Sequence, residues 1–135
     1  MSHYHAVVWI DHAEAHVMHI SPDDPDVESS VLRPSHPHRK LHHKRGMDKG
    51  GAVGNGRAPE DQDFYHEVVE ALKGAHEILI VGPANAKLNL IKHIHSHDQQ
   101  MSDKVIGVET VDHPSDGQLV DYARRYFKAA DRMRP

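Results

Sequence analysis

The stretch Tyr4–Asp11, which reads YHAVVWID, decides the fold together with the residues that follow it. β-Branched and aromatic residues fill this stretch, as is typical of a buried strand. In Glu14–Ile20 (EAHVMHI), successive side chains alternate between two faces, which is typical of a second strand. His12 and Ala13 leave room only for a short turn. The sequence therefore predicts a hairpin of two antiparallel strands.

A third strand follows at Val27–Arg33 and is more polar, so we expect it near a sheet edge, after a turn at Ser21–Pro25 with two prolines. We then predict helices over Asp61–Lys73, around Leu88–His95 and from Ser115 to about Met133, and strands over His76–Val81 and Lys104–Val111. Ser115 and Gln118 have the spacing of a capping box. The order βββαβαβα predicts one α/β domain over residues 1–135, with a mixed five-stranded sheet and helices on its faces.

The element pattern also predicts which side chains form the core. We expect the sheet to bury Trp9, Ile10, Ile78, Ile80 and Val108, and the helices to pack Phe64, Leu88, Tyr126 and Phe127 on it.

A basic segment interrupts the pattern between the third strand and the first helix. Residues 33–57 carry seven Lys or Arg against one acid, a formal charge of +6, whereas the rest of the chain has 9 against 19, or −10. Prolines and glycines are frequent from about 34 to 59, so we expect a mobile basic loop there. Such a segment on an acidic body indicates contact with nucleic-acid phosphates, although a loop charged only for solubility is the alternative.

Composition excludes several classes of protein. Without cysteine there is no disulfide and no thiolate metal site. The start of the chain has no secretion-signal pattern, and no apolar stretch approaches the ~20 residues that span a bilayer. We therefore expect a soluble, cytoplasmic protein.

Three stretches resemble one protein family. Val7–Val17 (VVWIDHAEAHV) resembles the start of the middle domain of archaeal and eukaryotic peptide chain release factors and of pelota. Ile80–Lys87 (IVGPANAK) is similar to the family's strand, Gly-containing turn and Lys-bearing helix start, and Val108–Gly117 (VETVDHPSDG) to the strand and turn before its last helix. The resemblance runs in order along nearly the whole chain and implies a ribonuclease H-like fold and a ribosome or RNA context.

The basic segment lies where release factors carry their Gly-Gly-Gln loop, which promotes ester hydrolysis in the peptidyl transferase centre. The nearest match in this chain is Gly50-Gly51-Ala52, in which Ala replaces Gln and offers no side-chain amide. The resemblance therefore implies a ribosome partner without peptide release.

A magnesium-dependent nuclease is one alternative reading. Asp11 fits the first carboxylate of such a site and Glu67 or Glu70 a second, but the strand that ends at Gly82-Pro83 offers no third. A turn-forming role for Asp11 is the simpler interpretation. Nucleophilic catalysis and a phosphate-binding loop have no matching motif in the sequence.

A metal-responsive or protein-interaction domain is the other alternative, because the chain has 15 histidines. His93 and His97 are four residues apart on one predicted helix, which is a spacing of metal ligands, while His95 points elsewhere. The sequence fixes no third ligand.

The leading hypothesis is a non-enzymatic, translation-associated protein that binds the ribosome or RNA. No cofactor, membrane contact or DNA partner is expected, and the sequence names no protein partner. The expected RNA-binding residues are Arg39, Lys40, His42, His43, Lys44, Arg45, Lys49 and Arg57.

Overall fold

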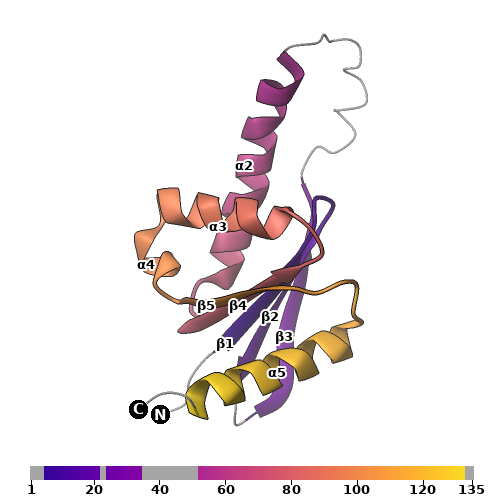
Figure 1. The fold of residues 1–135 in the computed structure, drawn as a ribbon, viewed down its shortest axis with the longest axis vertical. Coiled ribbons are helices and arrows are strands. Elements are labelled where there is room, and N and C mark those ends of the chain that lie inside the picture. The colour runs from indigo at the N-terminus through magenta and orange to yellow at the C-terminus, as the bar shows by residue number, and fades with distance from the viewer. Residues whose placement is uncertain (1–4, 22–23, 35–51, 133–135) are drawn as a thin grey trace.

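The computed structural model describes residues 5–21, 24–34 and 52–132, and its elements follow the predicted order (Figure 1). The strands are β1 (His5–Ile10), β2 (Ala15–Ser21), β3 (Asp24–Leu32), β4 (Glu77–Gly82) and β5 (Val105–Thr110). The helices are α2 (Ala52–Leu72), α3 (Ala86–His97), α4 (Gln99–Ser102) and α5 (Asp116–Arg132).

The strands form one five-stranded mixed sheet in the order β3-β2-β1-β4-β5, which confirms the predicted fold class. β2 is antiparallel to β1 and β3, whereas β4 and β5 run parallel to β1. Val8, in the central strand, pairs with Val17 on one side and Ile80 on the other. β3 is an edge strand as expected. Pro25 in β3 lies beside a register irregularity at Ile20 and Ser21, where a missing backbone N–H is tolerated.

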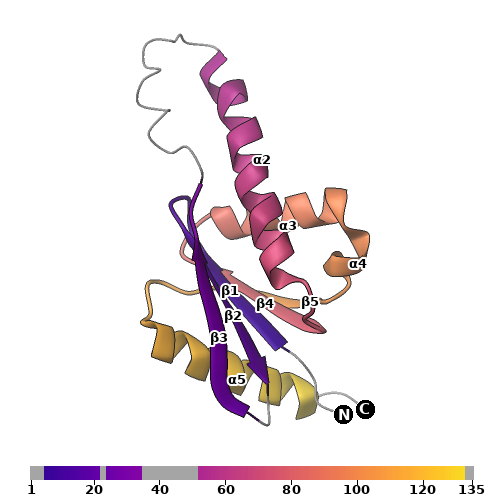
Figure 2. The ribbon, with the colours of Figure 1, turned by 180° about the vertical axis from the view of Figure 1, so that it is seen from behind.

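Helices cover both faces of the sheet, so the molecule has three layers (Figure 2). α2, α3 and α4 lie on one face, where Val8, Ile10, Val17, Ile78 and Ile80 pack against Phe64, Val68, Leu72, Leu90 and Ile94. α5 covers the other face, where Val7, Trp9, Met18, Ile20, Leu79 and Val81 pack against Leu119, Ala123 and Phe127. The strict alternation along β1 and β2 divides their side chains between these two cores.

The capping box at the start of α5 is confirmed. The backbone N–H of Gln118 donates to the hydroxyl of Ser115 at 3.2 Å, and the backbone N–H of Ser115 donates to the side-chain oxygen of Gln118 at 2.9 Å. Two exposed N–H groups at the helix end are thereby satisfied.

The first helix begins at Ala52, well before the predicted start at Asp61. The last part of the loop expected over residues 34–59 is therefore helical, from Ala52 onward. Gly54, Gly56 and Pro59 disfavour a helix when taken singly. Extending a helix costs much less than starting one, and the part of α2 from Phe64 to Leu72 is anchored in the core. Residues 35–51 lie outside the described chain, and the mobility expected for the segment stays a prediction.

Three predicted core positions differ from the structure. The prediction that Leu88 is buried is wrong, because its side chain is 48% exposed, whereas Leu90 is fully buried. Val108 and Tyr126 are only half-buried because β5 is the other edge strand. The short helix α4 was not predicted. It begins where Asp98 accepts a hydrogen bond from the N–H of Met101 at 3.0 Å, and Met101 is buried.

None of the described helices combines the length and the apolar character needed to cross a membrane.

Candidate functional site

β1, β4 and β5 are parallel, so their C-terminal ends lie at the same end of the sheet. We call this end, which runs across the strands, the carboxyl edge. Crevices outside this edge are where open α/β sheets bind ligands. Three connections lie there: the turn after Ile10, the turn after Gly82 and the loop after Thr110. The end of β3 reaches the same edge, because Leu32 pairs with Ala15 at the start of β2.

The turn after β1 is built by Asp11. Its side-chain oxygen Oδ1 accepts hydrogen bonds from the backbone N–H groups of Ala13 and Glu14 at 2.8 and 2.9 Å. Its own N–H donates to the carbonyl of Glu14 at 3.0 Å. The structure therefore confirms the turn-forming role of Asp11.

The two candidates for the second carboxylate of the nuclease hypothesis lie on α2. Glu67 is exposed, and Glu70 forms an ion pair with Lys73 at 3.1 Å on the helix surface. Within the described chain, no three His, Asp or Glu side chains are placed together to hold a metal ion.

β1 and β4 pack closely where β4 ends. A Cβ at Gly82 would overlap the carbonyl oxygen of Ile10, so any residue other than glycine would push the two strands apart. Lys87, at the start of α3, is 7% exposed, and its Nζ donates to the carbonyl of Ala84 at 2.6 Å. This lysine therefore ties the turn to the helix that follows it.

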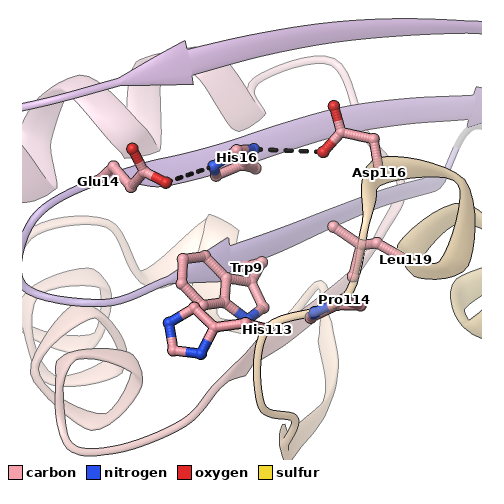
Figure 3. A pocket seen from close by; sticks show the side chains of 7 residues that line it. All are labelled: Trp9, Glu14, His16, His113, Pro114, Asp116 and Leu119. Atoms are coloured by element: carbon pink, nitrogen blue, oxygen red, sulfur yellow. Dashed lines mark hydrogen bonds and ion pairs between the residues drawn. The ribbon is translucent and has the colours of Figure 1, made fainter.

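A small pocket opens on the α5 side of the carboxyl edge (Figure 3). Seven residues line it: Trp9, Glu14, His16, His113, Pro114, Asp116 and Leu119. The indole N–H of Trp9 donates to the carbonyl of Asp112 at 2.5 Å, and the ring of His113 lies 5.0 Å from the indole, centre to centre. The volume is about 120 Å³, well below the roughly 300–1,000 Å³ typical of small-molecule sites.

His16 bridges two carboxylates in this Trp9 pocket (Figure 3). Nε2 of His16 lies 2.8 Å from Oε2 of Glu14, and Nδ1 of His16 lies 3.4 Å from Oδ1 of Asp116. Arg33 reaches Glu14 from the end of β3 at 3.2 Å. The hydrogen bond from His16 holds the pKa of Glu14 below its usual value; burial opposes this effect, and the charges of His16 and Arg33 add to it.

The described chain stops at residue 34, just after β3 ends at the carboxyl edge, and resumes at the start of α2. Both ends lie at the same end of the molecule, and the N-terminal part of α2 projects past the sheet (Figures 1 and 2). Of the predicted RNA-binding residues, Arg57 lies in α2, and the others lie outside the described chain. Ala52 is the first residue of α2, whereas Gly50 and Gly51 lie outside the described chain.

The predicted histidine pair lines a groove of about 370 Å³ between α2 and α3, together with Gln62, Tyr65, Asn89, Lys92 and Ser96. The rings of His93 and His97 stack with centres 4.3 Å apart. His95 points away, as expected, and lies 3.2 Å from the hydroxyl of Ser102. We call this the α2–α3 groove.

Sequence reasoning missed both the Trp9 pocket and two neighbours of the histidine pair, Gln62 and His66. The alternation along β2 places His16 on the α5 face, but its partner Asp116 is 100 residues away in the chain. On α2, the helical spacing of Gln62 and His66 was the available signal, because residues four apart share a face.

No family model and no curated protein matches the sequence of this chain. Solved structures match its fold. Pelota from Archaeoglobus fulgidus matches with a TM-score of 0.60 and 15% identity, over 90% of this chain and 31% of that one. Pelota from Thermoplasma acidophilum matches with a TM-score of 0.56 and 18% identity, over 90% and 32% of the two chains. The chain thus has a pelota-like fold and spans about a third of the length of these proteins.

Proposed function

We propose that this protein is a translation-associated, non-enzymatic RNA-binding protein that contacts the ribosome through its basic segment and acts in the cytoplasm. The observation that carries the proposal is the pelota-like fold over 90% of the chain. The sequence motifs at Val7–Val17 and Ile80–Lys87 support the same relationship and its ribosome context.

The charge distribution supports the phosphate contact. The contacting residues are Arg39, Lys40, His42, His43, Lys44, Arg45, Lys49 and Arg57. Arg33, the first cation of the segment, is held by Glu14 at 3.2 Å, so the contact begins beyond it. Lys and Arg gain affinity for RNA because they release condensed counterions from the phosphates.

One feature of the body argues against a nuclease. Asp11, the first carboxylate of that hypothesis, is committed to a turn through two hydrogen bonds. Ala52 stands where the release-factor motif has Gln, so we expect no release of peptide from ribosome-bound peptidyl-tRNA above background.

Co-sedimentation with purified ribosomal subunits at a series of salt concentrations tests the proposal. The parent protein should sediment with the subunits at low salt and dissociate steeply as salt rises. Lowering the pH from about 7.5 to 6 should tighten binding, because the four histidines of the segment, His36, His38, His42 and His43, gain charge near their usual pKa of about 6.5. A protein that stays in the supernatant at every salt concentration contradicts the proposal.

A further inference from the structure

β5 is the last strand of the sheet, and one side of its backbone faces away from the other strands (Figure 1). In the described chain its only strand partner is β4. The N–H of Val111 donates to the carbonyl of Gly82 in β4 at 3.1 Å. Because successive residues of a strand direct their backbone groups to opposite sides, Val108 and Thr110 point theirs away from β4. These outward N–H and C=O groups are a template for pairing with a further strand.

The two edge strands of the sheet differ in their protection against such pairing. β3 carries Pro25, Asp26 and Glu28, and proline and charged residues are the usual protection of an edge strand. β5 reads VIGVET, with Glu109 as its one charged residue, and its first five residues are half-buried. Its register irregularity with β4 lies before Gly107, so the pairing after that position is regular. β5 is therefore the strand suited to accept a partner.

A half-buried carboxylate lies beside the outer side of β5. Glu109 pairs with Val81, which packs in the core beneath α5, so the side chain of Glu109 is on the α5 face of the sheet. The hydroxyl of Tyr126 donates a hydrogen bond to this carboxylate. In the described chain no Lys, Arg or His forms an ion pair with Glu109. Such a carboxylate favours a cation that comes from another molecule.

Two tyrosine rings of α5 lie next to this carboxylate. The ring centres of Tyr122 and Tyr126 are 6.4 Å apart, and their planes are tilted by 35°. A Cβ at Gly107 would overlap the hydroxyl of Tyr126, so this ring reaches across β5. Burial raises the pKa of both hydroxyl groups, and the charge of Glu109 raises it further, so both rings stay neutral. Neutral tyrosine rings attract the charged groups of Lys and Arg.

We propose that the outer side of β5 binds an extended protein segment that carries a Lys or Arg side chain on the α5 face. The segment adds a strand to the sheet through the backbone groups of Val108 and Thr110. A residue of the segment that lies opposite Glu109 has its side chain on the same face of the sheet as Glu109. Opposite residues have Cβ atoms about 4.5–5.5 Å apart, which brings a basic side chain to Glu109 and Tyr126.

The charges at β5 select a basic protein segment instead of RNA. Glu109 repels phosphate, and the chain outside residues 33–57 has a formal charge of −10. A polypeptide also supplies the N–H and C=O groups that pair with the strand. On the other face of the sheet, Val108 pairs with Ile80, which packs beneath α2 and α3. A residue opposite Val108 is therefore apolar, and the segment alternates basic and apolar residues.

Titration of the full-length protein with a synthetic peptide in which arginine and valine alternate tests the site. Hydrogen exchange of the Val108 and Thr110 amides, followed by nuclear magnetic resonance, should slow on binding, because both amides gain hydrogen bonds. Glu109→Gln should weaken the affinity by about two- to fivefold, as expected for an opposite-charge pair across two strands. Tyr122→Leu should weaken it by a similar factor. Glu28→Gln is the matched control, since it removes the same charge from β3, and should bind like the parent.

Equal affinities of Glu109→Gln and Glu28→Gln, or slowed exchange in β3 without β5, overturn the proposal. So does a peptide with glutamate in place of arginine that binds as tightly. A single-stranded RNA that protects the β5 amides better than the peptide overturns the choice of partner. Val108 amides already protected in a self-associated protein show that a second copy occupies β5 instead. Equal midpoints of urea unfolding for parent and variants exclude a loss of folding as the cause.

Discussion

At the scale of single residues, Gly82 is a position that has no room for a side chain. A Cβ at Gly82 would overlap the carbonyl oxygen of Ile10, so Gly82→Ala has to push two paired strands apart. We expect a loss of about 1–3 kcal/mol in the free energy of unfolding, typical of overpacking. Gly117 in α5 has open space around it, and Gly117→Ala should be neutral or stabilise by up to about 1 kcal/mol. Urea unfolding compares the two; equal stability of both variants contradicts the packing at Gly82.

The His16 bridge makes a prediction about the titration of Glu14. His16→Ala should raise the pKa of Glu14 toward 4.5, because it removes the hydrogen bond that lowers this pKa most. In the parent, the lowered pKa means that the interaction stabilises the fold above about pH 4.5 and is lost as the pH falls through the folded-state pKa of Glu14.

Carboxyl-carbon nuclear magnetic resonance follows this titration directly. His113→Ala is the control, because His113 contacts Asp11 and Asp112 instead of Glu14. An unchanged Glu14 pKa in His16→Ala would show that the bridge does not form in solution.

At the scale of elements, α3 shows which of its two leucines anchors it. Leu90 is fully buried between α3 and the sheet, whereas Leu88 is 48% exposed. Leu90→Ala should lower the free energy of unfolding by about 2–5 kcal/mol, and Leu88→Ala by no more than about 0.5 kcal/mol. Chemical denaturation of both variants measures the difference, and a larger loss for Leu88→Ala would mean that α3 is rotated about its axis.

The error at Leu88 shows where the sequence stops being informative about an element. Apolar residues of α3 lie on more than one side of the helix, so the pattern indicates a helix without fixing its rotation. The buried positions are set by the sheet beneath, at Ala86, Lys87, Leu90, His93 and Ile94. The opening hairpin and the capping box were predictable, because strand alternation and the Ser115–Gln118 spacing act over a few residues. The early start of α2 was not predictable, because the residues that anchor this helix in the core lie farther along the chain.

At the scale of the whole molecule, the sequence predicted the sheet and the segregation of charge, but not the Trp9 pocket. Trp9 and Asp112 are joined by a hydrogen bond across 103 positions of sequence. Asp112 lies between β5 and α5, and its contact with Trp9 depends on how these elements pack on β1, so no local sequence pattern indicates this pair. The histidine pair on α3 was recognised because its spacing is local, whereas Gln62 and His66 depend on how α2 packs.

The central claim is that the basic segment binds RNA phosphates, and the salt dependence of binding to ribosomal subunits tests it most directly. Each phosphate contact contributes about 0.7–0.9 to the slope of log affinity against log salt. Replacing Arg39, Lys40, Lys44 and Arg45 together with Gln should weaken binding and reduce the slope by about three if all four contact phosphate. A matched variant changes the same charge on the body, at Lys73, Lys104, Arg125 and Lys128, and should bind like the parent. If the segment variant binds as tightly as the parent at every salt concentration, the basic segment is not the RNA-binding site.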